Sequence, residues 1–297
     1  MTDRAGGVRD AAGVVVAGGR STRMGTPKAA LEWHSSTLLR RVTGVVARAV
    51  RGPVIVVRAP GQDLPALDPR VLVREDPEEG GGPMVGLAVG LAAAAGHAEV
   101  AFVCSTDLPF LHSAFVTAVL RGFDTAPAPD VVLPVVGGFR QPMAAGYRTA
   151  LVPRVGKLVD AGRAKPAHLF EEVAVRRLDE NALLADARLA EADPALDSVV
   201  NVNTPGDYRA ARERPAPEVV VERHGALATG NGGAGPRRVL AATVGAAAER
   251  VGLTLDGHVV AAINGERVHG DAESPLEAGD IVSFIPAVSF SPGDLAH

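Results

Sequence analysis

Short runs of β-branched residues alternate with longer segments rich in alanine and leucine over the first two thirds of the chain. Uninterrupted apolar runs separated by helical segments are typical of strands that are buried on both faces of a sheet. The pattern therefore predicts an α/β fold with a doubly wound, mostly parallel sheet. The apolar runs lie at 13–17, 54–57, 71–73, 100–104, 131–135 and 173–175, and the helical segments at about 37–50, 84–95, 113–121 and 148–161.

The pattern changes after residue 212, where a charged stretch with two prolines reads as a linker over 213–217. Beyond it we expect a second, small α+β domain over 218–290. Its predicted elements are a strand at 219–223, a glycine-rich loop at 230–235, a helix at 244–251, a strand at 259–264 and a last strand at 280–285. The main domain then covers 11–212, with a flexible N-terminus at 1–10 and a tail at 291–297.

Composition narrows the class of protein. With 47% apolar and 22% charged residues among 297, the chain has ample material for a folded core. Its formal net charge of −4 disfavours a nucleic-acid binder. The single cysteine, Cys104, cannot form an internal disulfide and suits a reducing compartment. The most apolar stretch, 84–96, is shorter than the ~20 residues that cross a bilayer. We therefore expect a cytoplasmic protein that binds neither nucleic acid nor membrane.

The first predicted strand runs directly into a loop that reads GGRSTRMGTPK over 18–28. Glycines let backbone N–H groups approach an anion closely, and consecutive N–H groups in a turn form an anion-binding concavity. Arg23 and Lys28 add two cations that suit a pyrophosphate group. The loop matches neither the Walker A pattern nor the dinucleotide fingerprint. A glycine-rich strand exit with solvated cations is the alternative interpretation.

Asp107 follows a predicted apolar strand at the end where α/β sheets bind their ligands. A carboxylate in a cleft is costly unless it meets a cation, and Mg²⁺ prefers oxygen ligands. Asp107 is therefore a candidate metal ligand. The alternative is an N-cap of a helix that begins near His112.

Four motifs in the same order resemble those of the molybdenum-cofactor nucleotidyltransferases, the MobA-like NTP transferases. They are the loop at 16–28, GPMVGL at 82–87, DLPFL at 107–111 and NVNTPGD at 201–207. The resemblance covers about 11–212 and implies a Rossmann-like nucleotidyltransferase fold. It also implies a loop that wraps a nucleoside triphosphate, together with Mg²⁺ as the cofactor.

The resemblance assigns roles residue by residue. It implies Arg23, Lys28 and Asp107 as catalytic residues, and Asp107 with Asn203 as oxygen ligands of the metal. Asn203 and the nearby Asn201 instead suit an Asx turn before a helix in the alternative interpretation. The nucleotide-binding set is Ala17, Gly18, Gly19, Arg23, Met24, Gly25, Lys28, Asp76, Gly82 and Pro83, and the acceptor-binding set is Gln141 and Pro142.

The implied reaction is nucleotidyl transfer, in which an acceptor phosphate attacks the α-phosphorus and pyrophosphate leaves. The implied acceptor is of the molybdopterin type. Mg²⁺ on Asp107 bridges the reacting phosphates, while Arg23 and Lys28 hold the pyrophosphate. The sequence VAGG at 16–19 resembles the guanine-using branch and favours GTP, whereas Pro27 departs from that branch. The alternatives are a cytidylyltransferase of the same pathway, a sugar-phosphate nucleotidyltransferase, and a catalytically silent nucleotide-binding scaffold.

Residues 218–290 resemble the small sulfur-carrier proteins of molybdopterin and thiamin synthesis (MoaD/ThiS-like), which have the ubiquitin-like β-grasp fold. The matching stretches are ATV at 242–244, VAAINGE at 260–266 and PLEAGD at 275–280, followed by FIPAVS at 284–289. Those carriers end in Gly-Gly directly after this point, whereas this sequence continues FSPGDLAH at 290–297. We therefore expect a vestigial or docking domain that transfers no sulfur, with other cofactor-synthesis proteins as the partners it would dock to.

Overall fold

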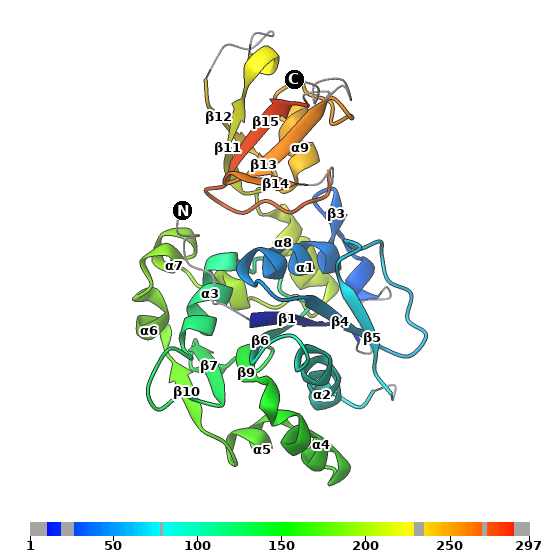
Figure 1. Cartoon of the computed structure of the whole chain (residues 1–297), viewed down its shortest axis with the longest axis vertical. Coiled ribbons are helices and arrows are strands. Elements are labelled where there is room, and N and C mark those ends of the chain that lie inside the picture. The colour runs from blue at the N-terminus through cyan, green and yellow to red at the C-terminus, as the bar shows by residue number, and fades with distance from the viewer. Residues whose placement is uncertain (1–10, 19–26, 78–79, 229–234, 269–271, 288–297) are drawn as a thin grey trace, which may run out of the picture. The chain divides into compact units, whose positions relative to one another are not determined.

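The computed structural model describes residues 11–18, 27–77, 80–228, 235–268 and 272–287. The chain divides into two compact units, residues 1–33 with 37–213 and residues 34–36 with 214–297 (Figure 1). The predicted flexible N-terminus and the predicted tail at 291–297 lie outside the described residues.

An eight-stranded sheet forms the centre of the larger unit. Its strand order is β10-β7-β9-β6-β1-β4-β5, with β8 paired to β7. Only β8 and β9 run antiparallel to their neighbours in the described sheet. The predicted α/β fold with a mostly parallel sheet is thus confirmed. The strands are β1 (Ala11–Val16), β4 (Val54–Arg58), β5 (Leu72–Glu75), β6 (Val100–Ser105), β7 (Val131–Val136), β8 (Phe139–Arg140), β9 (Ala144–Arg148) and β10 (Val175–Leu178); β2 (Glu32–Trp33) and β3 (Ser36–Thr37) form a separate short sheet.

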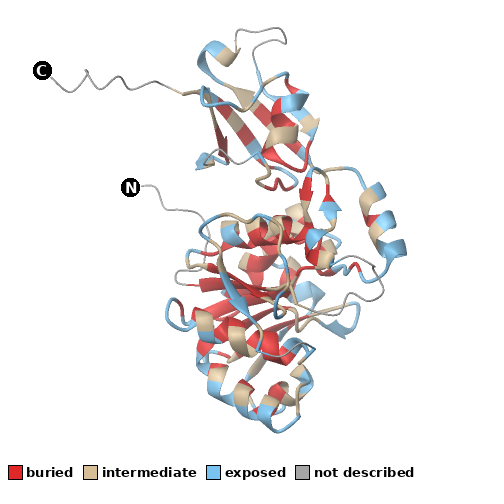
Figure 2. Cartoon of the chain, turned by 90° about the vertical axis from the view of Figure 1, so that its right-hand side faces the viewer, coloured by how far each residue is buried: buried red, intermediate tan, exposed pale blue. Residues whose placement is uncertain are grey.

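Helices cover both faces of the large sheet, as the buried strands require. Consecutive residues of β1 point to opposite sides: Val15 packs in one buried cluster with α1 and α3, and Val14 in another with α2 and α4. Figure 2 shows these strands as buried. The helices are α1 (Leu38–Ala49), α2 (Pro83–Ala94), α3 (Ser113–Arg121), α4 (Val152–Asp160), α5 (Pro166–Phe170), α6 (Glu180–Leu184), α7 (Ala187–Ala192) and α8 (Pro205–Glu213).

The structure adds elements that the pattern did not indicate. The central strand β9 has the sequence AAGYR, which is poor in β-branched residues. Its burial comes from its place between β6 and β7 and not from its own composition. The short helices α5 to α8 were also missed, because five- to nine-residue helices carry little periodicity.

The smaller unit holds a five-stranded sheet in the order β12-β11-β15-β13-β14, with α9 (Val244–Arg250) between β12 and β13. The predicted order lacked β12 and β14 and was wrong there. Both strands lie at sheet edges and begin with charged residues, which masks the alternation of a strand. The strands are β11 (Glu218–Arg223), β12 (Arg237–Leu240), β13 (Val259–Ile263), β14 (Glu266–Val268) and β15 (Ile281–Pro286).

No helix within the described ranges is both long and apolar enough to cross a membrane.

Candidate active site

The predicted site residues follow strands that end at one edge of the large sheet. Strands β6, β1, β4 and β5 are parallel neighbours, so their carboxyl ends lie together. Gly18 follows β1, Asp76 follows β5 and Asp107 follows β6. Ligands of open α/β sheets bind at this edge. The sheet order therefore gathers residues that are far apart in the sequence.

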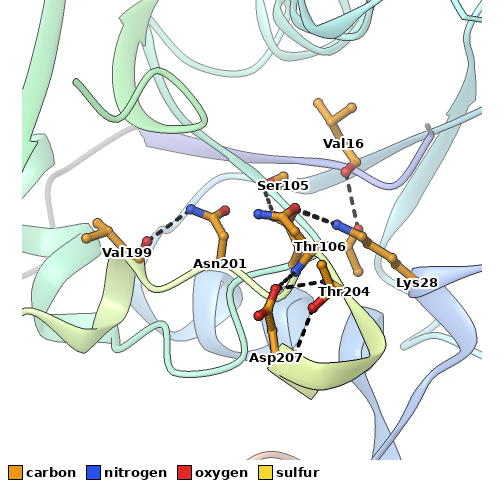
Figure 3. Close-up of polar contacts among 10 residues, drawn as sticks. Val16, Lys28, Ser105, Thr106, Val199, Asn201, Thr204 and Asp207 are labelled. Carbon is orange, nitrogen blue, oxygen red and sulfur yellow. Dashed lines mark hydrogen bonds and ion pairs between the residues drawn. The ribbon is translucent and has the colours of Figure 1, made fainter. Parts of the chain in front are cut away.

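Lys28 lies between two oxygen atoms at this edge (Figure 3). Its Nζ is 3.0 Å from Asp107 Oδ2, and it donates to Asn203 Oδ1 at 2.9 Å. The Lys28 and Asp107 side chains are 22% and 15% exposed, so solvent screens this ion pair less than a surface pair. The structure thus brings together three of the residues that the sequence singled out.

The loop after β6 holds Asp107 in place. The Ser105 hydroxyl donates to Asp107 Oδ1, and the backbone carbonyl of Asp107 accepts from Val202 N at 2.9 Å. Thr106 donates its hydroxyl to the Val16 carbonyl at 3.2 Å, which ties this loop to the end of β1 (Figure 3). The alternative interpretation of Asp107 as an N-cap is wrong, since α3 begins at Ser113 and His112 caps it.

Asn203 owes its position to the start of α8. The Thr204 hydroxyl accepts from Asp207 N at 3.1 Å, while the Asp207 carboxylate accepts from Asn203 N at 3.0 Å and Thr204 N at 2.9 Å. This reciprocal arrangement is a capping box, with Pro205 as the first helical residue. The backbone N–H of Asn203, followed by that of Thr204, lowers the pKa of the Asp207 carboxyl.

The side chain of Asn203 is directed to Lys28 and does not cap the helix. The side chain of Asn201 donates instead to the Val199 carbonyl at 3.1 Å (Figure 3). Asn203 is therefore the asparagine that shares the Lys28 site with Asp107.

The same arrangement suits a divalent cation. The Lys28 ammonium acts as a stand-in cation, and the two oxygens around it are a carboxylate and an amide carbonyl. Mg²⁺ takes such oxygens and usually keeps only one or two protein ligands, filling the rest with phosphates and water. Among the described residues no group of three or more His, Cys, Asp or Glu side chains is arranged to hold a metal. The donor set therefore fits Mg²⁺ that is bound together with a phosphate-bearing ligand.

On the β4 side of this edge, the side chain of Gln62 links the loop after β4 to the loop after β1 through hydrogen bonds. Its amide oxygen accepts from Ala59 N at 2.9 Å and its amide nitrogen donates to the Ala17 carbonyl at 3.2 Å. A Cβ on Gly18 would lie 3.0 Å from Ala59 N, so the glycine permits this close approach. The motif analysis missed Gln62, because its partners are backbone atoms and no spacing reveals them.

Gly82 and Pro83 form the start of α2. Gly82 is the N-cap with φ of +83°, a conformation that favours glycine, and Pro83 is the first helical residue. Farther along the motif, a Cβ on Gly86 would lie 2.9 Å from a methyl of Val16. The second glycine of this motif therefore lets α2 pack closely on β1.

Of the other predicted residues, Asp76 donates its backbone N–H to the Arg58 carbonyl at 2.8 Å at the end of β5. Pro142 accepts from the Tyr147 hydroxyl at 2.7 Å, and the Met143 carbonyl next to it accepts from Ser105 N at 3.2 Å. Gln141 and Pro142 thus lie beside the strand that carries Asp107. Gly19, Arg23, Met24 and Gly25 lie outside the described residues.

The single cysteine is inert in this arrangement. Cys104 is fully buried in β6, and burial raises the pKa of its thiol, followed by a smaller effect of the Asp107 carboxylate. A thiol in this setting packs as an apolar side chain.

The lysine held by a carboxylate and an amide oxygen thus lies at the edge of a mostly parallel α/β sheet where such sheets bind their ligands. A family profile described as "MobA-like NTP transferase domain" matches residues 13–178. The match spans more than half of the chain, and the chain belongs to this family.

Individual proteins agree with this assignment. The chain is 39% identical over 179 residues to a protein of Mycobacterium tuberculosis H37Rv named "Probable molybdenum cofactor guanylyltransferase", which covers 60% of this chain and 85% of the relative. A protein of Mycobacterium ulcerans with the same name is 40% identical over 189 residues, covering 62% of this chain and 92% of the relative. Among solved structures, molybdopterin-guanine dinucleotide biosynthesis protein A from Archaeoglobus fulgidus has a TM-score of 0.53 at 19% identity, covering 68% of this chain and 97% of that one. This last likeness concerns the fold.

Proposed function

We propose that the larger unit transfers GMP from GTP to the phosphate of a molybdopterin-type acceptor and releases pyrophosphate. The names of the mycobacterial relatives support the reaction and both substrates. The observation that carries the proposal is the Lys28 ammonium held by Asp107 and Asn203 at the ligand-binding edge of the sheet.

Positioning and charge neutralisation dominate this chemistry, since a phosphate acceptor is already a nucleophile at neutral pH. A bound Mg²⁺ supplies charge neutralisation to the phosphate oxygens. Asp107 and Asn203 are the residues that would hold this ion through their side-chain oxygens. Lys28, with an ammonium at the same place, binds the phosphates and stabilises the negative charge that builds on the leaving pyrophosphate. Arg23 is proposed to share this role.

The test is pyrophosphate release from GTP with molybdopterin and Mg²⁺. We expect Lys28→Met and Asp107→Asn each to lower turnover by about 100-fold or more, as for the loss of one electrostatic stabiliser. Arg163→Met and Glu172→Gln are matched controls, because they break an exposed ion pair of 2.6 Å between the residues that flank α5, without touching the site. Parental turnover in both site variants would contradict the mechanism. Tight GTP binding by the parental protein without any pyrophosphate release would favour the silent scaffold.

Guanine is the proposed base. The support is the VAGG sequence at 16–19 together with the guanylyltransferase names of the relatives. Asp76, beside the Arg58 carbonyl at the end of β5, is the proposed residue that contacts the base. Titrations with GTP, CTP and ATP test this choice. Tightest binding of CTP would overturn it in favour of a cytidylyltransferase.

For the smaller unit we propose the β-grasp fold and a docking role. The support is its strand order, in which the first and last strands are parallel neighbours at the centre of a mixed sheet. A helix follows the first hairpin and packs on that sheet through Val244, Ala247 and Ala248. The residues from 287 to 297 contain no Gly-Gly pair, so this domain is proposed to bind cofactor-synthesis proteins and not to carry sulfur.

A further inference from the structure

Phe139 is the most exposed large apolar side chain among the described residues. It is 74% exposed, whereas the next, Leu240, is 48% exposed. An isolated exposed aromatic ring adds nothing to the core. Its position in the fold therefore decides what it does.

The backbone around Phe139 is firmly held although its ring is exposed. Phe139 pairs with Val136 in the β7–β8 hairpin, whose turn is formed by Gly137 and Gly138 with φ of +60° and +76°. The Glu180 carboxylate accepts from Gly137 N at 2.7 Å, and the Gln141 side chain donates to the Phe139 carbonyl at 3.3 Å. A Cβ on Gly137 would lie 3.8 Å from the Phe139 ring, so the ring lies against its own turn.

The strand registers bring this hairpin to the level of the site. Val132, Gly146 and Phe102 share one row across β7, β9 and β6. Val136 lies four residues after Val132 on β7, and it pairs with Phe139. The residue at the same level on the β6 side is Thr106, which lies four residues after Phe102.

The β8 strand of the hairpin lies on the β9 side of β7. Gln141 N donates to the Pro134 carbonyl at 2.9 Å, so β8 continues along β7 toward β9, and Ser105 N donates to the Met143 carbonyl at 3.2 Å. β9 separates β7 from β6, so with strands about 4.8 Å apart the backbone of Phe139, on the β6 side of β7, lies within roughly 10 Å of the line of β6.

We propose that Phe139 is a stacking platform for the flat pyrimidinone ring of the acceptor's pterin, and that it contributes to acceptor specificity. This inference rests on the proposed function, because it requires an acceptor whose phosphate lies at Asp107. Stacking on an aromatic side chain recognises flat heterocycles with little demand for hydrogen bonds. The Phe139 ring suits stacking, because its backbone is held by hydrogen bonds and one face of the ring is exposed to solvent. Gln141, which was predicted to bind the acceptor, would then act through Phe139, because its side chain donates a hydrogen bond to the Phe139 carbonyl.

The test uses the full chain with two substitutions of the same residue. Phe139→Leu keeps an apolar side chain and removes the ring, whereas Phe139→Tyr keeps the ring. We expect Phe139→Leu to raise the KM for molybdopterin about tenfold, with the KM for GTP unchanged. We expect Phe139→Tyr to stay within about twofold of the parental value. Leu240→Ala, which removes an exposed apolar side chain from the smaller unit, is the control and should change neither constant.

A second readout does not depend on turnover. The fluorescence of 6-hydroxymethylpterin phosphate should be quenched by the parental protein and by Phe139→Tyr, and much less by Phe139→Leu. Equal quenching and equal molybdopterin KM in Phe139→Leu and the parental protein would overturn the inference. So would a change in the GTP KM alone, which would place the ring at the nucleotide. A parental protein that releases no pyrophosphate with molybdopterin would contradict the proposed function instead.

Discussion

At the scale of single residues, the Lys28 ammonium lies where the two proposed metal ligands converge. Its contacts of 3.0 Å and 2.9 Å with Asp107 and Asn203 place a positive charge between these oxygens. Two cations at this distance repel each other, so the ammonium and a divalent ion compete for the same oxygens.

We predict that Lys28→Met binds Mn²⁺ in the absence of nucleotide about tenfold more tightly than the parental protein, because the competing ammonium is gone. The same variant should lose turnover, so metal affinity and activity change in opposite directions. Calorimetric titration with Mn²⁺ measures the affinity, and Lys157→Met on α4 serves as the control. Equal or weaker Mn²⁺ binding by Lys28→Met would argue against a shared site.

The site residues that the sequence analysis singled out belong to recognisable motifs, whereas the residues that it missed do not. Lys28 and Asp107 belong to motifs that follow predicted strands, and Asn203 belongs to a motif at 201–207 that resembles one of the family, so all three are visible in the sequence. Ser105 and Gln62 act through hydrogen bonds whose partners become neighbours only after folding. Phe139 was missed because a lone phenylalanine in a polar stretch reads as ordinary until its exposure is known.

At the scale of elements, the capping box of α8 links helix stability to the site. The Asp207 carboxylate is lowered in pKa below its ordinary 3.8, chiefly by the backbone N–H of Asn203. A group whose pKa is lower in the folded state stabilises the fold above its unfolded-state pKa. That contribution is lost as the pH falls through the folded-state value.

We predict that Asp207→Ala lowers the urea midpoint of unfolding at pH 7, and that the gap to the parental protein narrows as the pH falls below about 4. Turnover at pH 7 should fall as well, because Asn203 loses the partner of its backbone N–H. Asp160→Ala, which removes an exposed carboxylate from α4, is the comparison. An unfolding gap that stays constant from pH 7 to pH 3 would show that the charge of Asp207 is irrelevant.

Four of the strands that the pattern predicted have their own side chains buried on both faces. β1, β4, β6 and β7 read as apolar runs because helices cover both sides of them. β9 is equally buried, yet alanine and glycine fill most of its positions, and only its neighbours define it as a strand. Burial that comes from tertiary contacts leaves little trace in a local pattern.

At the scale of the whole molecule, the two units have separate buried clusters. The smaller unit packs Val219, Leu276 and Phe284 in a core of its own. All residues of the proposed active site belong to the larger unit.

We predict that a chain cut after residue 214 keeps GMP transfer within about twofold of the full chain, since it retains both clusters of the large sheet. The full chain, but not the cut chain, should bind the large subunit of molybdopterin synthase in a titration followed by light scattering. Loss of transfer on truncation would make the smaller unit part of the catalytic apparatus. Equal binding by both chains would remove its docking role.

The contact between Lys28 and Asn203 joins positions that are 175 residues apart. A ribosome must therefore synthesise nearly the entire larger unit before Asn203, the later of the two proposed metal ligands, can meet the lysine. Because β11 begins only at Glu218, the five-stranded sheet of the smaller unit is synthesised after every residue of the proposed catalytic centre. The order of translation thus allows the larger unit to fold before the sheet of the smaller unit has been synthesised.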